Sequence, residues 1–205
     1  MVNGVASSLA IARRYRHLRR FRHVVEVLLK HGFGYIFEHL ELGHLIPVGK
    51  RREYPDKGIP VAVRFRLVLE ELGPTFIKLG QVLSTRPDIL PRHFIEELEK
   101  LQADVPSTPF SEIKVEIERE LGASLAELFA QVDEVPLATA SIGQVHRARL
   151  HDGQEVVIKV QRPGVAGVIK TDTEIMMGLA RLAEDRVFSF SPVELVDEFR
   201  RAMQR

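Results

Sequence analysis

The chain has 205 residues, enough to bury a hydrophobic core in one sizeable domain or in two small ones. Its composition, 45% hydrophobic and 28% charged, excludes the collagenous, low-complexity and wholly disordered classes. Because there is no cysteine, the chain has no disulfide framework, no thiolate metal site and no cysteine nucleophile. The net charge of +1 hides an asymmetry: residues 1–52 hold ten Lys/Arg against three Glu, a net of +7, which leaves −6 for residues 53–205.

The N-terminal region, residues 1–52, combines a basic run with an apolar stripe. Six arginines fall within residues 13–22, and no apolar stretch is long enough to cross a membrane. Two interpretations remain open: an amphipathic helix lying on anionic lipid, and a basic helix packed on its own domain. With no recognisable nucleic-acid module, nucleic acid is not an expected partner, and the histidines lack metal-ligand spacing. The stripe consists of Leu28, Leu29, Phe33, Ile36, Phe37 and Leu40.

A polar linker at residues 49–60 precedes a series of predicted helices. The periodicity predicts helices over 61–72 and from Pro74 to about Pro87, separated by Gly73-Pro74. Further helices are expected over about 92–102, over 112–121 with Ser111 as N-cap and Gly122 at the end, and from Ser124 to about 130. In the second helix Lys78 and Gln81 share one face, while Gly80 allows close approach of another backbone. Two surface polar residues would give the same pattern.

After Pro136 the hydrophobic period changes from 3.6 to 2. Strands are predicted near 132–138, over 144–150 and over 154–161, with Asp152-Gly153 as a hairpin turn, which gives three antiparallel strands. In the third strand alternation predicts that Val156, Ile158 and Val160 face one way and that Val157, Lys159 and Gln161 face the other. Lys159 thus lies among valines and isoleucine. It is either an edge-strand lysine that points to water or a lysine that holds phosphates. A run of small residues stands where a kinase has its phosphate loop: Ala138, Thr139, Ala140, Ser141, Ile142 and Gly143.

Five ordered segments together resemble the N-terminal signature of the UbiB/AarF-type atypical kinase-like family. They are GPTFIKLGQ at 73–81, STRPDILP at 84–91, LQADVP at 101–106, PLATASIGQVHRA at 136–148 and VVIKVQRPGV at 156–165. The resemblance implies an α+β fold, in which a helical N-terminal extension is followed by a protein-kinase-like N-lobe with a short antiparallel sheet. The division expected from it is a basic helical region (1–52), a helical extension (53–131) and a partial N-lobe (132–205).

The resemblance also implies roles for individual residues. Lys159 should contact the nucleotide's α/β-phosphates, residues 138–143 should cover the phosphates, and Lys78 and Gln81 should project into the site. ATP and Mg²⁺ are the implied cofactors. The implied partners are a membrane lipid or isoprenoid quinone precursor and an anionic membrane surface bound through residues 1–45. The implied activity is that of an atypical kinase or ATPase supporting ubiquinone biosynthesis, peripheral on the cytoplasmic face of a bacterial inner membrane.

Two departures from the family pattern and one missing part qualify these expectations. Thr139 interrupts the alanine run, and Val157 replaces the alanine of V-A-I-K, which predicts a tighter adenine pocket. The chain has no H-R-D or D-F-G motif, so we expect the C-lobe and the metal ligands to lie beyond residue 205 and this segment alone to be inactive. Glu194 and Glu198 come too early to be the lysine's partner. The alternative function is that of a catalytically silent, pseudokinase-like lipid-binding or scaffold protein.

Overall fold

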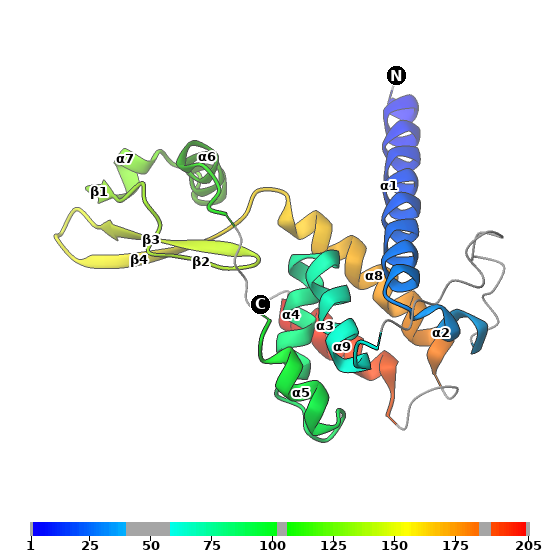
Figure 1. Cartoon of the computed structure of the whole chain (residues 1–205). Coiled ribbons are helices and arrows are strands. Elements are labelled where there is room, and N and C mark those ends of the chain that lie inside the picture. The colour runs from blue at the N-terminus through cyan, green and yellow to red at the C-terminus, as the bar shows by residue number, and fades with distance from the viewer. Residues whose placement is uncertain (1, 40–57, 102–105, 185–189, 204–205) are drawn as a thin grey trace. The chain divides into compact units, whose positions relative to one another are not determined.

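The computed structural model describes residues 2–39, 58–101, 106–184 and 190–203, with side chains omitted for 2–13 and 38–39 (Figure 1). The chain divides into two compact units. The first, helical unit comprises Met1–Leu101 and Ile169–Arg205; the second, mixed unit comprises Gln102–Val168. The division expected from sequence had its boundaries after residues 52 and 131. Most of the linker predicted at 49–60 lies outside the described residues.

The helical unit is built from elements at both ends of the chain. Its helices are α1 (Val2–Lys30), α2 (Gly34–His39), α3 (Val61–Leu72), α4 (Pro74–Leu83), α5 (Arg92–Leu98), most of α8 (Val165–Ala183) and α9 (Pro192–Met203). Helix α3 packs against α1, α4 and α5. The predicted break between α3 and α4 is confirmed: Gly73 has a φ of +91°, and Pro74 occupies the first turn of α4, where its missing N–H needs no partner.

The basic N-terminal run is part of one long helix, and its apolar stripe is largely used inside the unit. Leu29, Phe33 and Phe37 are all buried. The turn after α1 is joined to α3 by Glu71, whose carboxylate accepts hydrogen bonds from Lys30 Nζ at 2.8 Å and pairs with His31 Nε2 at 2.8 Å. For these apolar residues, therefore, packing on their own unit is the arrangement that the structure shows. Leu40 lies outside the described residues.

A buried ion pair joins α1 to α8 within the helical unit. Asp172 is 1% exposed and accepts hydrogen bonds from Arg20 Nε at 2.7 Å and from Arg20 Nη2 at 3.0 Å. Arg20 also donates to the carbonyl of Leu72 at 2.7 Å and lies over the ring of Phe76 at 5.5 Å. One arginine therefore connects α1 with α8, with the end of α3 and with α4.

The mixed unit consists of α6 (Phe110–Leu121), α7 (Leu125–Leu128) and a four-stranded antiparallel sheet (Figure 1). The strands are β1 (Gln131–Val132), β2 (Ala138–Thr139), β3 (Gly143–Arg149) and β4 (Glu155–Gln161). Strand β3 pairs with β1 and β2 and, along its whole length, with β4. The hairpin predicted at Asp152-Gly153 is confirmed, because Gly153 has a φ of +90°. This small sheet with its helix has the arrangement of a kinase N-lobe.

Two sequence predictions in this unit are corrected. The region predicted as one strand near 132–138 forms two short strands, β1 and β2, because Pro136 interrupts the pairing with β3. Helix α6 begins at Phe110 with Pro109 at the N-cap, so the predicted N-cap, Ser111, lies within the first turn. The predicted cap of the next helix is confirmed: the backbone N–H of Ser124 donates to Glu127 Oε2 at 2.8 Å. A hydrogen bond from the Ser124 hydroxyl, and next this backbone bond, lowers the pKa of Glu127.

Candidate functional site

The two faces of β4 have different environments. Val156, Ile158 and Val160 are covered to different degrees, and the last two pack with Ile113 and Ile117 of α6. The alternate residues Val157, Lys159 and Gln161 are exposed on the opposite face of the strand. Because side chains alternate along a strand, this confirms the predicted division of β4 into a packed face and an open face.

Lys159 lies on the open face, directly opposite Val145 of β3. Its ammonium group makes no hydrogen bond or ion pair with any residue in the described part of the chain. Among the described strands β4 pairs only with β3, so exposure alone also fits an edge-strand lysine that points to water. What favours phosphate binding is the position of Lys159, which shares one sheet with the loop at 138–143.

The small-residue loop is a tight turn between β2 and β3. Ala138 and Thr139 belong to β2, and the N–H of Ala140 donates to the carbonyl of Gly143 at 2.8 Å, so the turn itself is residues 140–142. The backbone N–H groups of Ser141 and Ile142 have no acceptor among the described residues. Backbone N–H groups that converge in a turn are a common way to bind phosphate. The loop thus has two backbone donors without an acceptor among the described residues, one on the buried Ser141 and one on the half-buried Ile142.

Arg162, which was not predicted from sequence, holds this turn in place. Its backbone N–H donates to the carbonyl of Ile142 at 3.0 Å, and its guanidinium donates to the carbonyl of Ala140 at 3.4 Å. The same guanidinium donates to the carbonyl of Pro106 at 2.7 Å and to the hydroxyl of Thr108 at 3.1 Å. Burial lowers the pKa of Arg162. The turn is therefore fixed before any ligand binds.

Behind the open face, a buried series of side-chain hydrogen bonds anchors β3. Gln144 Oε1 accepts from the N–H of Thr108 at 2.9 Å, so Gln144 Nε2 is the amide donor and lies 2.8 Å from His146 Nε2. His146 must then accept at Nε2 and donate from Nδ1 to the carbonyl of Asp133, 2.8 Å away, which makes it a neutral imidazole. His146 is fully buried. These two residues of the signature are thus structural, joining the segments around Thr108 and Asp133 to the sheet.

Gly143, the last residue of the predicted loop, has a steric reason to be glycine. A Cβ atom there would lie 2.6 Å from the backbone oxygen of Val160. Because the neighbour is backbone in the β3–β4 ladder, it cannot move aside without breaking the pairing. Gly143 therefore brings the two strands together directly beside Lys159.

Lys78 and Gln81 lie on α4 in the helical unit, whereas Lys159 and the loop lie in the mixed unit. Gln81 donates from Nε2 to the carbonyl of Leu101 at 3.3 Å. Lys78 is half-buried and has no hydrogen bond or ion pair with the described residues. The close approach predicted at Gly80 exists, but it is to side chains: a Cβ there would lie 2.3 Å from Leu101 Cδ1 and 2.6 Å from Leu69 Cδ1.

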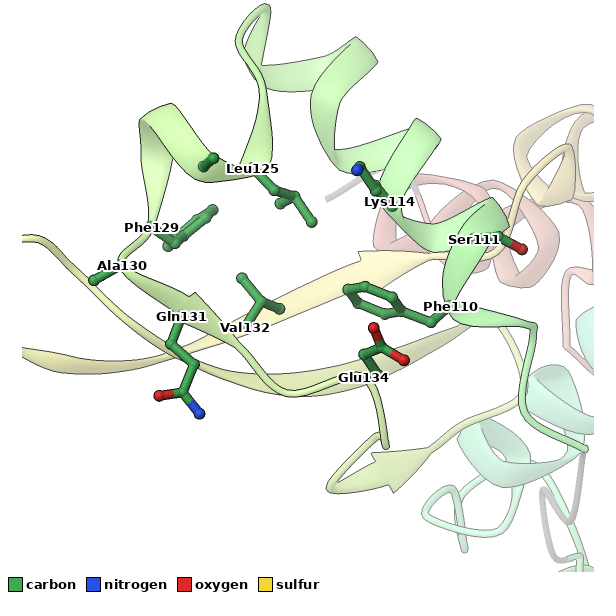
Figure 2. A pocket seen from close by; sticks show the side chains of 10 residues that line it. Phe110, Ser111, Lys114, Leu125, Phe129, Ala130, Gln131, Val132 and Glu134 are labelled. Atoms are coloured by element: carbon green, nitrogen blue, oxygen red, sulfur yellow. The ribbon is translucent and has the colours of Figure 1, made fainter.

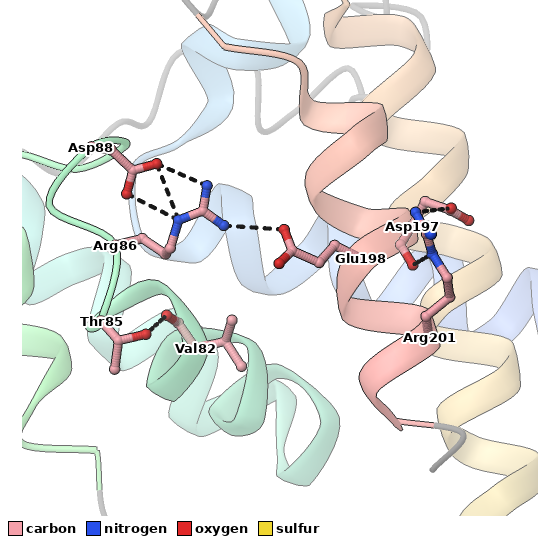
Figure 3. Close-up of polar contacts among 7 residues, drawn as sticks. All are labelled: Val82, Thr85, Arg86, Asp88, Asp197, Glu198 and Arg201. Atoms are coloured by element: carbon pink, nitrogen blue, oxygen red, sulfur yellow. Dashed lines mark hydrogen bonds and ion pairs between the residues drawn. The ribbon is translucent and has the colours of Figure 1, made fainter.

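The STRPD part of the signature forms a polar connection between the end of α4 and α9 (Figure 3). Arg86 donates to both carboxylate oxygens of Asp88 and, at 3.1 Å, to Glu198 Oε2 of α9. The guanidinium of Arg86 lowers the pKa of Asp88. Thr85 donates its hydroxyl to the carbonyl of Val82 at 2.8 Å. This part of the signature therefore has a structural role, and Glu198 is engaged by Arg86.

A pocket of about 610 Å³ opens on the helix-covered side of the mixed unit (Figure 2). Phe110 and Phe129 line it together with Leu125 and Val132, and the charged Lys114 and Glu134 also belong to its lining. Phe110, Leu125 and Phe129 also pack on the core of the unit. The pocket is thus a hollow in the packing between α6, α7 and β1, on the other side of the sheet from Lys159.

The described residues contain no group of three or more His, Asp or Glu side chains placed to hold a metal ion. On the open face, Glu155 is the one carboxylate within β3 and β4, and it lies opposite Arg149. The polar groups described around Lys159 are therefore mainly hydrogen-bond donors.

The sheet, its phosphate-loop-like turn and its exposed strand lysine define a kinase-like N-lobe. Residues 100–205 match the ABC1 atypical kinase-like domain, and the chain belongs to this UbiB/AarF-type family. The chain is 39% identical over 181 residues to an uncharacterized protein in the hydrogenase 1 5′ region of Clostridium pasteurianum, covering 87% of this chain and 32% of that protein.

Two relatives that carry a UbiB name have identities above 39%. "Probable protein kinase UbiB" of Azotobacter vinelandii is 46% identical over 159 residues, covering 76% of this chain and 29% of that protein. The protein of the same name from Cellvibrio japonicus is 45% identical over 152 residues, covering 72% of this chain and 27% of that protein. The chain thus spans about a third of the length of these relatives. A solved Rv3197–erythromycin complex from Mycobacterium tuberculosis matches with 32% identity and a TM-score of 0.42, covering 64% of this chain and 34% of that one.

Proposed function

We propose that the full-length protein binds ATP on the open face of the mixed unit and acts as an atypical kinase or ATPase. The observation that carries this proposal is the position of Lys159. It is exposed, it has no partner among the described residues, and it lies on one sheet with a turn whose Ser141 and Ile142 N–H groups are unused. A cation and preset backbone donors are what a polyphosphate requires.

The remaining parts of a phosphoryl-transfer site would come from elsewhere in the protein. We propose that Lys78 and Gln81 also contact the bound nucleotide, as the family resemblance implies. Because Glu155 is the one carboxylate in β3 and β4 and lies opposite Arg149, the carboxylates that hold Mg²⁺ would come from other segments of the protein. When bound, the metal ion would neutralise charge on the phosphates.

The test is a thermal shift on the full-length protein with ATP and Mg²⁺. A ligand that binds the folded state raises the melting temperature, and Lys159→Ala should abolish that rise. Lys114→Ala is the matched control, because Lys114 is an exposed lysine on α6, on the packed side of the sheet. An ATP-dependent shift that is the same in the Lys159 variant and in the wild type would overturn the proposal.

For the biological role we propose support of ubiquinone biosynthesis, with a membrane lipid or isoprenoid quinone precursor as partner. The support is the match to relatives named UbiB. The second candidate is a catalytically silent scaffold. In a strain that lacks the gene, full-length wild type should restore ubiquinone content and the Lys159→Ala variant should not. Restoration by the variant would favour the scaffold.

A peripheral membrane contact on the cytoplasmic side of a bacterial inner membrane completes the proposal. No helix in the described part of the chain is long and apolar enough to cross a bilayer. Of the proposed segment 1–45, the residues from 40 onward lie outside the described residues. On α1, Tyr15 and Leu18 are exposed beside Arg14, Arg16 and Arg19, a combination that suits an anionic interface. Binding to anionic vesicles that is released by salt would support the contact, whereas equal binding to neutral vesicles would contradict it.

A further inference from the structure

A second cation lies on the same open face as Lys159. In the β3–β4 ladder Val145 is opposite Lys159 and Arg147 is opposite Val157. Residues directly opposite each other in an antiparallel pair point to the same side, so all four side chains belong to one face. Arg147 and Lys159 are diagonal neighbours, with Cβ atoms no more than ~7–8 Å apart.

The turn at 140–142 marks one end of this face, so the residue pairs along it can be ordered by their distance from the turn. The turn adjoins the beginning of β3, where Gly143 is paired with Gln161, and the pair of Val145 and Lys159 follows two residues further along the ladder. The pair of Arg147 and Val157 follows two residues further from the turn. A nucleotide whose phosphates lie against the turn and Lys159 would therefore place its base near the second pair.

The chemistry of this second pair suits a flat aromatic ring. Val157 is an apolar side chain that is 65% exposed. Arg147 beside it is exposed and has no hydrogen bond or ion pair from its side chain to the described residues. A planar guanidinium stacks on aromatic rings, and a valine provides the apolar contact.

The other charged groups on this face already have hydrogen-bond partners or lie opposite one another in the sheet. Arg149 donates to Gln131 Oε1 at 3.1 Å and lies opposite Glu155. Asp133 follows β1 beside Arg147, to which it is joined by a backbone hydrogen bond, and its carboxylate accepts from Gln131 Nε2 at 3.4 Å. Arg147 is thus the arginine of β3 whose guanidinium is available.

We propose that Arg147 stacks on the base of the nucleotide bound at Lys159, and so helps to set base affinity and specificity. The proposal rests on the nucleotide site proposed above and adds a contact that acts on the base and not on the phosphates. It also gives a reason for valine instead of the family's alanine at position 157, because the larger side chain would contact the base at the edge away from Arg147.

The test compares ATP with inorganic tripolyphosphate, each titrated against the full-length protein by calorimetry. Arg147→Ala should weaken ATP about tenfold, the size of a partly desolvated cation–π contact, and leave tripolyphosphate unchanged. Lys159→Ala should weaken both. The matched control is Arg149→Ala, two residues along the same face, which should change neither. Circular dichroism should show all three variants folded, since each replaced side chain is exposed.

Two results would overturn the contact to the base while leaving the site at Lys159 intact. One is ATP binding that depends on Lys159 but is unaffected by Arg147→Ala. The other is an equal loss of ATP and tripolyphosphate affinity in Arg147→Ala, which would make Arg147 a phosphate contact. By contrast, a wild type that binds neither ligand would overturn the proposed nucleotide site itself.

Discussion

The ion pair between Arg20 and Asp172 allows a quantitative test of how the helical unit is held together. The perturbation is Arg20→Met, which keeps a long apolar side chain over Phe76 and removes the guanidinium. Asp172 would then be left buried at 1% exposure, without the two hydrogen bonds of 2.7 and 3.0 Å that compensate its charge. The carbonyl of Leu72 would also lose its bond from Arg20.

The magnitude follows from the burial of the carboxylate. Breaking a buried ion pair by removing one partner costs about 3–5 kcal/mol, because an uncompensated charge stays in the interior. Since the side chain of Arg20 is itself 23% exposed, water can reach part of the site, and we expect a loss of about 3 kcal/mol in the free energy of unfolding. Replacing both partners, as Arg20→Met with Asp172→Leu, should recover most of this loss, to within about 1 kcal/mol of wild type.

The assay is urea unfolding followed by far-UV circular dichroism, with hydrogen exchange to locate the change in α1 and α8. The control is Arg22→Met, on the same helix, whose 79% exposed side chain pairs with Glu26 at the surface and should cost no more than about 0.5 kcal/mol. A loss below about 1 kcal/mol for Arg20→Met, or a double variant as unstable as the sum of the two single ones, would refute the reasoning.

Four further variants test other parts of the fold. Gly80→Ala should destabilise the chain by about 1–3 kcal/mol in urea unfolding, because the added methyl group overpacks the contact with Leu69 and Leu101. Gly178→Ala, whose added methyl group meets no neighbour, should instead stabilise α8 by up to about 1 kcal/mol. A change of the same sign in both variants would contradict the packing argument. His146→Ala should cost several kcal/mol and speed amide exchange in β3, and full retention of exchange protection would argue against the buried series of side-chain hydrogen bonds. The hydrogen bond from Lys30, and next the one with His31, lowers the pKa of Glu71, so Glu71→Gln should destabilise the chain near neutral pH. The difference should decline as pH falls below 4.5, the ordinary value for this carboxyl, and vanish once pH is below the lowered pKa of the folded state. A difference independent of pH would contradict that assignment.

Local features of the fold could be predicted from the sequence because their causes lie within a few residues. The break at Gly73-Pro74, the hairpin at Asp152-Gly153 and the two faces of β4 each follow from local backbone preference or from alternation, and each is confirmed. Pro136 shows the limit of this reasoning, since alternation near it predicted one strand where the ladder with β3 leaves two.

Contacts between distant segments could not be predicted in this way. Arg20 and Asp172 are 152 positions apart, and nothing local distinguishes Arg20 from the other arginines of its run. Gln144 and His146 are polar residues on a strand, a pattern that normally indicates solvent, yet they face the interior because Thr108 and Asp133 supply their partners. Helix α8 was not predicted at all.

The structure also separates two kinds of residue that the family signature contains. Arg86, Gln144 and His146 are committed to contacts within their own units, so their presence is explained by the fold alone. Lys159 is different, because it is exposed in the sheet and makes no polar contact with the described residues. A side chain that the fold does not need is the better candidate for contacting a ligand, and by the same criterion Arg147 joins Lys159 as the second one to test.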